Sequence, residues 1–508
     1  MPRRKNPKLL QDICLQKVAE RVCTHSVRSS ASIIHKGISK GVFSENLQWL
    51  PSAVMEKVIK IVHQLQPGGI YYNQLELLLS ANVRTLCLQY SASKSLRNVP
   101  LGFQRLLRKI AACGTNLVDL ALTGCVLWNN DELVSTIRCL PSLRRLVLYS
   151  SKLNDDVLVT VGETCNFIEE LYISGWYLSD QGLLGLFGSP TERGGCPHLH
   201  TLIIDSDRNY QPNITLEAVV RVLQKQTQLI HLKIPKLTEA ILFLGKKENV
   251  LSAHSSIRLG LMTYQDDLYQ SPLTPEDVKT LVSLCPSLSE IKITIDDPKA
   301  INELSKLSFL THLSLTDCRH HTCRDFIEAF TQLLAEVGIH ISYLELVTTE
   351  VDISAINRHC PHLKSLECLK ILRFHRNGGL DQQSPYFQEL TTLKLFPSEV
   401  NSIREEELFL LLGSCYCLKH LFVGWCDCLT DDCMARILQK NSFMRLQELE
   451  LSDIPAITIN GIKPLLLSEN DLNSCNILSC DQISKDDVVS MKKMAEALNL
   501  NLTIKFYD

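Results

Sequence analysis

The sequence lacks the features that would place it in several large classes of protein. None of its apolar runs approaches the roughly 20 uncharged residues of a membrane-spanning helix. The basic opening MPRRKNPK is not followed by the apolar run and small-residue cleavage site of a secretory signal. The phosphate loop, the H-E-x-x-H pair and the nucleophile elbow are absent as well. We therefore expect neither a membrane protein nor an enzyme, and no cofactor.

An excess of charge of either sign is also lacking. The chain holds 52 Lys and Arg against 55 Asp and Glu, a net charge of −3. Such a balance offers no basic surface for nucleic acid and no general attraction to an anionic membrane. The 20 cysteines are spread along the chain, mostly inside apolar runs, which indicates reduced thiols rather than a disulfide framework. We expect a cytoplasmic or nuclear protein whose residues 1–7 form a basic, disordered tail.

A short leucine pattern recurs from residue 83 onward. Its frame, L-x-x-L-x-L, is the strand signature of leucine-rich repeats. The last three copies start 28 residues apart, which leaves room for a helix in every repeat. The sequence therefore predicts an α/β leucine-rich-repeat solenoid, a horseshoe with a C-terminal cap, over residues 83–508. The copies begin at Leu117, Leu143, Ile168, Leu199, Leu229, Leu288, Leu310, Ile341, Leu390, Leu418 and Leu446.

Residues that favour helix starts lie between the strand frames. Thr274 is followed by a proline and, three residues on, by an aspartate, the pattern of a capping box. Thr430 and Ser484 are each followed by acidic residues, which are favourable at a helix N-terminus. We expect helices to begin at these three places.

Cysteines recur at two places in the repeat. Cys139, Cys285 and Cys360 come just before a strand frame, whereas Cys125 and Cys318 come just after one. Both places are expected to point into the narrow core, where a small apolar group fits. This usage resembles the cysteine-containing and ribonuclease-inhibitor-like classes of leucine-rich repeat, a resemblance that covers about four-fifths of the chain and is specific for fold alone.

Two segments, 236–287 and 369–389, interrupt the frame. In the first, residues 256–261 are the only trace of a strand, and KKENVLSAHSS and TYQDDLYQSPL on either side are expected to be loops. In the second, RNGGLDQQSPYF (376–387) is expected to be an exposed loop. Such loops often carry binding residues, although sequence drift explains them equally well.

The opening of the chain carries an apolar helical stripe. Residues 8–23 place apolar side chains at intervals of four, among them Leu10, Cys14 and Val18. The pattern L-x-x-x-C-x-x-x-V over residues 10–18 is similar to the BC box, the short helix by which substrate receptors bind elongin C. By that resemblance Leu10 would fill an apolar pocket on elongin C, with Cys14 packed beside it and Val18 extending the stripe.

A second helix follows from residue 50. Leu50-Pro51-x-x-Val54-x-x-x-Val58 is similar to the cullin-2 box, and the two boxes together form a VHL box over residues 8–82. A VHL box before leucine-rich repeats resembles the Zyg-type and PRAME-type receptors of cullin-2 ubiquitin ligases. The resemblance implies a non-catalytic substrate-recognition subunit. Its partners would be elongin C with elongin B, cullin-2 with its RING subunit, and a client protein.

Other interpretations of this region stay open. Residues 8–82 could simply cap the exposed core of the first repeat, as solenoids require. The stretch LPSAVMEKVIKIV (50–62) also resembles the start of an F-box, the module that joins receptors to cullin-1 ligases, although too few residues follow it for the remaining helices. A scaffold or an activator of a small GTPase is a further alternative, and no single arginine or asparagine stands out for the latter.

A cysteine-rich stretch near the C-terminus invites a zinc interpretation. Structural zinc sites usually use C-x-x-C spacing, whereas this stretch has C-x-C pairs, and the frame places Cys415 and Cys426 in the core. We expect no metal. The five cysteines are Cys415, Cys417, Cys426, Cys428 and Cys433.

The variable positions of the frame indicate where a client would bind. Side chains alternate along a strand, so the x positions should face the concave surface of the solenoid. Exposed aromatic residues there are candidate anchors. The candidate client-binding residues are Arg145, Tyr149, Glu170, Tyr172, Phe396 and Phe422.

Overall fold

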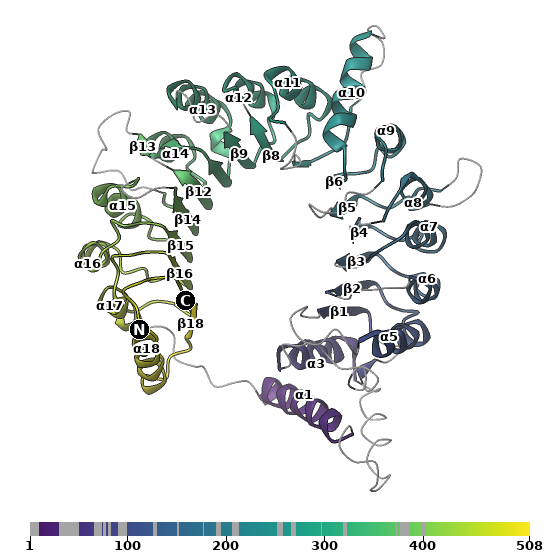
Figure 1. Cartoon of the computed structure of the whole chain (residues 1–508), viewed down its shortest axis with the longest axis horizontal. Helices are drawn as coiled ribbons and strands as arrows, with labels where there is room; N and C mark the ends of the chain where they lie inside the picture. Colours follow the sequence, from purple (N-terminus) through teal and green to yellow (C-terminus); the bar gives the residue numbers. More distant parts are fainter. Residues whose placement is uncertain are drawn as a thin grey trace. The chain divides into compact units, whose positions relative to one another are not determined.

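The computed structural model divides the chain into two compact units, each a succession of parallel strands and helices (Figure 1). The N-terminal unit comprises residues 8–253 and 259–261, and the C-terminal unit comprises residues 262–508 with 1–7 and 254–258. The structure describes residues 10–29, 50–65, 74, 78–79, 83–89, 99–124, 130–149, 152–175, 177–188, 195–205, 213–250, 258–265, 271–295, 297–317, 323–371, 373–375, 387–398 and 402–507.

The N-terminal unit begins with two helices and continues as a parallel sheet in the order β1-β2-β3-β4-β5-β6. Equivalent leucines lie opposite one another, so Leu86 pairs with Leu120 and Leu120 with Leu146. Its elements are α1 (Leu10–Ser29), α3 (Ser52–Leu65), β1 (Thr85–Gln89), α5 (Val99–Cys113), β2 (Asp119–Thr123), α6 (Asp131–Ile137), β3 (Arg145–Tyr149), α7 (Asp155–Thr164), β4 (Glu170–Ser174), α8 (Asp180–Leu186), β5 (Thr201–Asp205), α9 (Leu216–Lys225), β6 (His231–Lys233) and α10 (Leu237–Val250).

The C-terminal unit repeats the same plan, with strand order β7-β8-β9-β10-β12-β14-β15-β16-β17-β18 and a separate small sheet of β11 and β13. Its elements are β7 (Thr263–Gln265), α11 (Pro275–Leu284), β8 (Glu290–Ile295), α12 (Lys299–Glu303), η2 (Leu304–Lys306), β9 (His312–Asp317), α13 (Cys323–Val337), η3 (Gly338–His340), β10 (Tyr343–Val347), β11 (Glu350–Asp352), α14 (Ile353–His359), β12 (Ser365–Ile371), β13 (Arg373–His375), β14 (Thr392–Pro397), α15 (Glu405–Leu412), β15 (His420–Gly424), α16 (Asp431–Lys440), β16 (Glu448–Ser452), α17 (Ile459–Leu467), β17 (Ser474–Leu478), α18 (Lys485–Ala497) and β18 (Thr503–Tyr507).

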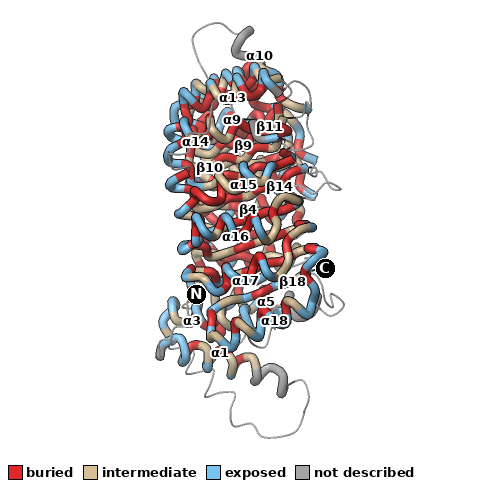
Figure 2. The backbone as a smooth tube through the Cα atoms, turned by 90° about the vertical axis from the view of Figure 1, so that its left-hand side faces the viewer, coloured by how far each residue is buried: buried red, intermediate tan, exposed pale blue. Residues whose placement is uncertain are grey.

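The core of each unit lies between the strands and the helices that cover one face of the sheet. The leucines of the frame are buried, as Leu418, Leu421 and Leu446 illustrate at 1% exposure or less. Figure 2 shows these buried segments following the stacked strands of the C-terminal unit, with exposed residues on the helices. We call the other face, away from the helices, the open face of the sheet. The predicted leucine-rich-repeat fold is confirmed: every frame start named above is followed by a parallel strand.

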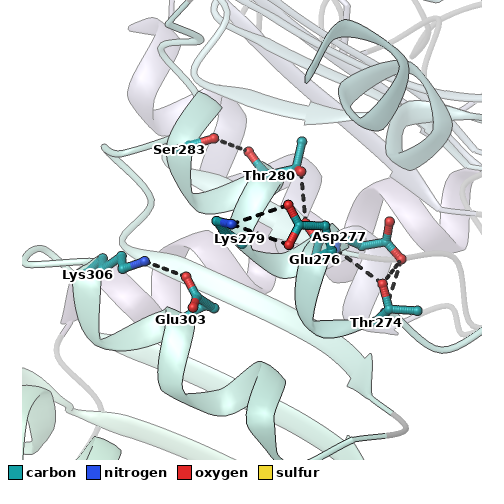
Figure 3. A network of polar contacts seen from close by, with 8 residues as sticks. All are labelled: Thr274, Glu276, Asp277, Lys279, Thr280, Ser283, Glu303 and Lys306. Atoms are coloured by element: carbon teal, nitrogen blue, oxygen red, sulfur yellow. Dashed lines mark hydrogen bonds and ion pairs between the residues drawn. The ribbon is translucent and has the colours of Figure 1, made fainter. Parts of the chain in front are cut away.

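The three predicted helix starts are also confirmed. The Thr274 hydroxyl accepts a hydrogen bond from the Asp277 amide, and the Thr274 amide donates back to the Asp277 carboxylate, which completes the capping box drawn in Figure 3. Thr430 and Ser484 likewise accept hydrogen bonds from backbone amides of the first turn. Each cap fixes the point at which the chain turns from strand to helix.

Acidic residues at helix starts link one repeat to the next. Asp155 accepts hydrogen bonds from the amide and hydroxyl of Ser179, which caps the next helix, at 2.8 and 2.5 Å. Asp431 does the same for Thr458, at 2.8 and 2.6 Å. The carboxylate lies so close to the next helix that a Cβ at Gly461 would be 2.5 Å from Asp431 Oδ1. These carboxylates therefore set the spacing of neighbouring helices.

The cysteine prediction holds in part. Cys285 and Cys360 are buried, and burial raises the pKa of each thiol to about 12. The prediction for Cys139 is wrong, because this side chain is exposed. The buried position lies three residues before the frame, and Leu140 occupies it in this repeat, which leaves Cys139 in the turn. The side chain of Cys125 and that of Cys318 lie outside the described residues.

The two irregular segments are more regular than predicted. Part of KKENVLSAHSS is helical, because α10 runs to Val250. Part of TYQDDLYQSPL is strand β7, in which buried Tyr264 takes a leucine position opposite Ile291. Phe387 ends the second expected loop yet is buried, and its amide donates a hydrogen bond to Asn357 Oδ1. Residues 251–257, 266–270 and 376–386 lie outside the described part of the chain.

Candidate docking surfaces

Helix α1 packs on α3 through one face and leaves a different face outside that contact. The packed face consists of Leu15, Ala19 and Val22, which are 7, 0 and 0% exposed. Cys14 is exposed and Val18 is half-buried. Leu10 is the first residue of the helix, and its side chain lies outside the described residues.

The angular spacing of an α-helix explains this division. Successive side chains are about 100° apart, so the stripe of residues 10, 14 and 18 is centred roughly 100° from the packed face. Val18, at the edge nearest the packed face, is partly covered, and Cys14, further round, is not. Ile13, which sits beside this stripe, is 42% exposed. The free side of α1 thus carries apolar groups that the packing of the N-terminal unit does not use.

Helix α3 presents only part of its proposed box. Pro51 is exposed, and Leu50 and Val54 are half-buried. Val58 is 0% exposed and lies on the buried face of the helix with Met55, Ile59 and Val62. Of the four residues of the proposed cullin-2 box, three have surface to offer and Val58 has none.

Polar side chains on α3 bind the first strand of the sheet. The Glu56 carboxylate accepts hydrogen bonds from the backbone amides of Arg84 and Thr85 at 3.3 and 3.0 Å. Burial works to raise the pKa of Glu56, but hydrogen bonds from Ser52 and these amides outweigh it and hold the pKa below its ordinary value. The amide of Gln89 lies 3.1 Å from His63 Nε2 at the other end of the strand. Helix α3 therefore covers the first strand as a preceding repeat would.

On the open face of the N-terminal unit, the candidate client-binding residues contact one another and a neighbouring aspartate. Arg145 lies 3.2 Å from Asp119 and 3.1 Å from Glu170, and its guanidinium is 5.3 Å from the centre of the Tyr172 ring. Burial lowers the pKa of Arg145, but these two carboxylates outweigh it and raise it. Burial also raises the pKa of Tyr149, the last candidate in this unit, which is half-buried. The positive charge of Arg145 is therefore neutralised within the chain by Asp119 and Glu170.

The open face of the C-terminal unit has a row of ion pairs and aromatic rings. Lys292 lies 2.9 Å from Glu345, and Lys394 lies 2.9 Å from Glu367. The Lys394 ammonium is also 5.5 Å from the centre of the Phe422 ring. Each of these contacts joins neighbouring or near-neighbouring strands, so the row runs across the repeats.

Phe396 and Trp425 stand at the carboxyl ends of β14 and β15. The Phe396 ring lies over Gly424, where a Cβ would be 2.6 Å from ring carbons. Trp425 follows directly, with a left-handed backbone (φ 55°) and 57% of its surface exposed. The sequence reasoning missed Trp425, because it follows the frame rather than lying within it. Its place in the repeat was a usable signal, since glycine takes the same left-handed place at Gly124.

The five cysteines of the predicted core stretch do not converge on one point. Cys415, Cys426 and Cys433 are buried, and the thiol of Cys415 donates a hydrogen bond to the Leu411 carbonyl. The sulfur atoms of Cys426 and Cys428 are 3.4 Å apart. Within the described ranges, no group of three or more histidine, cysteine or acidic side chains is arranged to hold a metal ion.

The fold and these surfaces make the chain a leucine-rich-repeat protein. No protein-family model matches the chain, and no curated protein is significantly similar to it. No helix in the described part of the chain is long and apolar enough to span a membrane.

Three solved structures illustrate the level of structural similarity found. An internalin (inlF) from Listeria monocytogenes is 13% identical, with a TM-score of 0.35 over 80% of this chain and 93% of its own. A yeast structure of the Rad7 and Elc1 complex is 17% identical, with a TM-score of 0.33 over 58% of this chain and 81% of its own. The TLR13–ssRNA13 complex is 15% identical, with a TM-score of 0.37 over 84% of this chain and 61% of its own. TM-scores this low do not establish a fold, which here rests on the repeat geometry of the chain itself.

Proposed function

We propose that the chain is the substrate-recognition subunit of a cullin-2 ubiquitin ligase. Its α1 would bind elongin C, and its repeats would hold a client protein. The observation that carries the proposal is the division of α1 into two apolar faces. Leu15, Ala19 and Val22 are used by the fold, whereas the side with Cys14 is exposed. A helix that served only as a cap would have no use for an apolar second face.

The expected strength of this contact follows from the area that it would bury. Burying a leucine side chain contributes about 1.5–3 kcal/mol. Leu10→Ala should therefore weaken binding of elongin C at least about tenfold. Cys14→Asp should abolish it, because the carboxylate would be buried without a partner. Cys14 does not belong to the packed face of α1, and Leu10 lies on the same stripe by helical spacing, so the repeats should remain folded in both variants.

Co-purification from cells tests the proposal. The wild type should recover elongins B and C and cullin-2, and the Leu10→Ala, Cys14→Asp double variant should not. Asp12→Ala is the matched control, because Asp12 is exposed on the same turn and lies outside the stripe. Normal recovery of elongins by the double variant would disprove elongin docking through this stripe. Unfolding of the double variant would assign α1 to capping alone.

The choice of cullin is tested at the start of α3. Changing Leu50, Pro51 and Val54 together to alanine should abolish cullin-2 recovery and leave elongin C bound. Val58 is left unchanged, because it is buried and its loss would disturb the packing. Recovery of cullin-1 with its adaptor by the wild type, without elongins, would favour the F-box interpretation instead.

The contacts of α3 favour one alternative function, that of a capped repeat scaffold. Because Glu56 and His63 hold α3 against β1, this region also has the geometry of a repeat cap. If the wild type recovers neither elongins nor any cullin, the chain is a capped scaffold whose function lies wholly on the repeats.

A further inference from the structure

The surface near the carboxyl ends of β14, β15 and β16 combines an exposed indole and a half-buried phenyl ring with two half-buried carboxylates. We call it the aromatic shelf and define it as Phe396, Gly424, Trp425, Glu450 and Asp453. All five residues lie in the C-terminal unit, on neighbouring repeats whose strands pair in register. Because Gly424 has no side chain, the Phe396 ring rests on the backbone at the residue directly before Trp425.

The exposure of Trp425 indicates that its indole is available to a partner. Its left-handed backbone belongs to this place in the repeat, since Lys236, Lys370, Asp453 and Ser479 adopt it as well. Trp425 occupies such a position with 57% of its surface exposed. It therefore gains little from packing within the chain, and tryptophan is among the residue types enriched at the energetic centres of protein interfaces.

Among the residues that the structure describes, the two carboxylates of the shelf, Glu450 and Asp453, form no ion pair. Lys394, the nearest cation on the row, is paired with Glu367 at 2.9 Å. Glu450 instead accepts a hydrogen bond from the side-chain Nδ2 of Asn476 at 3.2 Å, and Asp453 accepts one from the Ser452 hydroxyl at 2.6 Å. Neither donor carries a charge. The two carboxylates thus leave a negative potential on the repeat next to that of Trp425.

We propose that the aromatic shelf binds a client through a peptide segment in which an arginine or lysine lies next to an apolar side chain. The apolar side chain packs on Phe396 and Trp425. The cation lies against the indole face and is held by Glu450 and Asp453, since cations are attracted to both aromatic faces and carboxylates. The inference rests on the proposed function in one respect, that the repeats hold a client, and it does not depend on elongin.

The same reasoning separates the shelf from the cluster around Arg145. There the cation is already paired with Asp119 and Glu170, so a ligand would have to displace internal contacts. On the shelf, Glu450 and Asp453 form no ion pair with any described residue, and the Trp425 indole is exposed. We therefore place the client contact in the C-terminal unit.

Selection from a displayed library of random twelve-residue peptides tests this inference with the purified full-length chain. Peptides are selected on the wild type and depleted on Trp425→Ala. The enriched sequences should carry arginine or lysine beside an apolar residue. The best of them is then synthesised with a fluorescent label, and its affinity is measured by fluorescence anisotropy.

The variants have distinct expected effects. Trp425→Ala should weaken binding of the labelled peptide at least about tenfold, as loss of a central aromatic anchor does. Glu450→Gln should weaken it about two- to fivefold, and added salt should weaken it further. Tyr416→Ala is the matched control, since Tyr416 is 51% exposed at the opposite end of β15, and it should change nothing.

Several outcomes would overturn the inference. These are a selection that yields no Trp425-dependent peptide, enriched peptides that are acidic, or equal loss of affinity with Tyr416→Ala. Self-association of the wild type that Trp425→Ala abolishes in sedimentation would assign the shelf to a second copy of the chain. Trp425→Ala should still recover elongins, so failure of the shelf and failure of the proposed ligase role are distinguishable.

Discussion

The carboxylate of Asp431 joins two neighbouring repeats, and its removal should be costly. It accepts hydrogen bonds from the Thr458 amide at 2.8 Å and from the Thr458 hydroxyl at 2.6 Å. A hydrogen bond to a charged group contributes about 1.5–3 kcal/mol when buried. Asp431 is half-buried, so water would replace part of this loss. We expect Asp431→Ala to lower the free energy of unfolding by about 2–3 kcal/mol.

A second substitution shows whether the carboxylate acts through this contact. A methyl group at Gly461 would lie 2.5 Å from Asp431 Oδ1, well inside contact distance. Gly461→Ala should destabilise the wild type by about 1–3 kcal/mol, although alanine favours a helix by about 1 kcal/mol over glycine. In the Asp431→Ala background the obstructing oxygen is gone, and the same change should become neutral or stabilising. The two effects should therefore be strongly non-additive.

Urea denaturation followed by circular dichroism measures these effects, and hydrogen exchange of the α17 amides localises them. Asp432→Ala is the control, because Asp432 is the next acid in the first turn of α16 and is exposed. It removes the same charge from the helix start without touching Thr458. Equal destabilisation by Asp431→Ala and Asp432→Ala, or stabilisation of the wild type by Gly461→Ala, would refute the reasoning.

Three further outcomes are expected. Hydrogen bonds outweigh burial and hold the pKa of Glu56 below 4.5, so the attachment of α3 to β1 should persist at neutral pH and be lost as the pH falls through that lowered pKa. Protection of the Thr85 amide from hydrogen exchange measures this attachment, and Glu56→Gln should remove its pH dependence. Trp425→Gly should relieve the strain of a left-handed backbone, about 1–2 kcal/mol, and cost about 0.5–1 kcal/mol through the greater entropy of glycine in the unfolded chain. The net effect should be a slightly higher thermal midpoint of unfolding. Burial raises the pKa of Cys285 to about 12, so iodoacetamide should leave it unlabelled in the native protein at pH 8 while labelling exposed Cys139.

The regular part of the fold was predictable because a strict leucine frame determines both the strand and its register. The frame from Leu418 to Leu446 shows this, since the two strands pair residue for residue. Position within the repeat was less predictable. Cys139 was assigned to the core, although its neighbour Leu140 fills that place. A shift of one residue decides between core and turn, and apolar character alone does not settle it.

The candidate sites were less accessible to sequence reasoning than the fold. An apolar stripe on a helix does not show which of two apolar faces packs internally, and the small side chain of Ala19 hid the packed face of α1. Val58 fits a binding box by spacing, yet the helix uses it for packing. Trp425 lies outside the frame, and the exposure of its side chain is a three-dimensional property. These features depend on how elements meet, which spacing does not encode.

Protection of Cys14 from alkylation tests the central claim most directly. The thiol is exposed on the side of α1 that would meet elongin C, and Cys139, exposed elsewhere in the N-terminal unit, serves as an internal reference. The labelling rate of each cysteine is measured by mass spectrometry with and without a saturating complex of elongins B and C. The proposed function predicts that the elongins slow labelling of Cys14 at least about tenfold and leave Cys139 unchanged. Equal rates at Cys14 with and without elongins would contradict it.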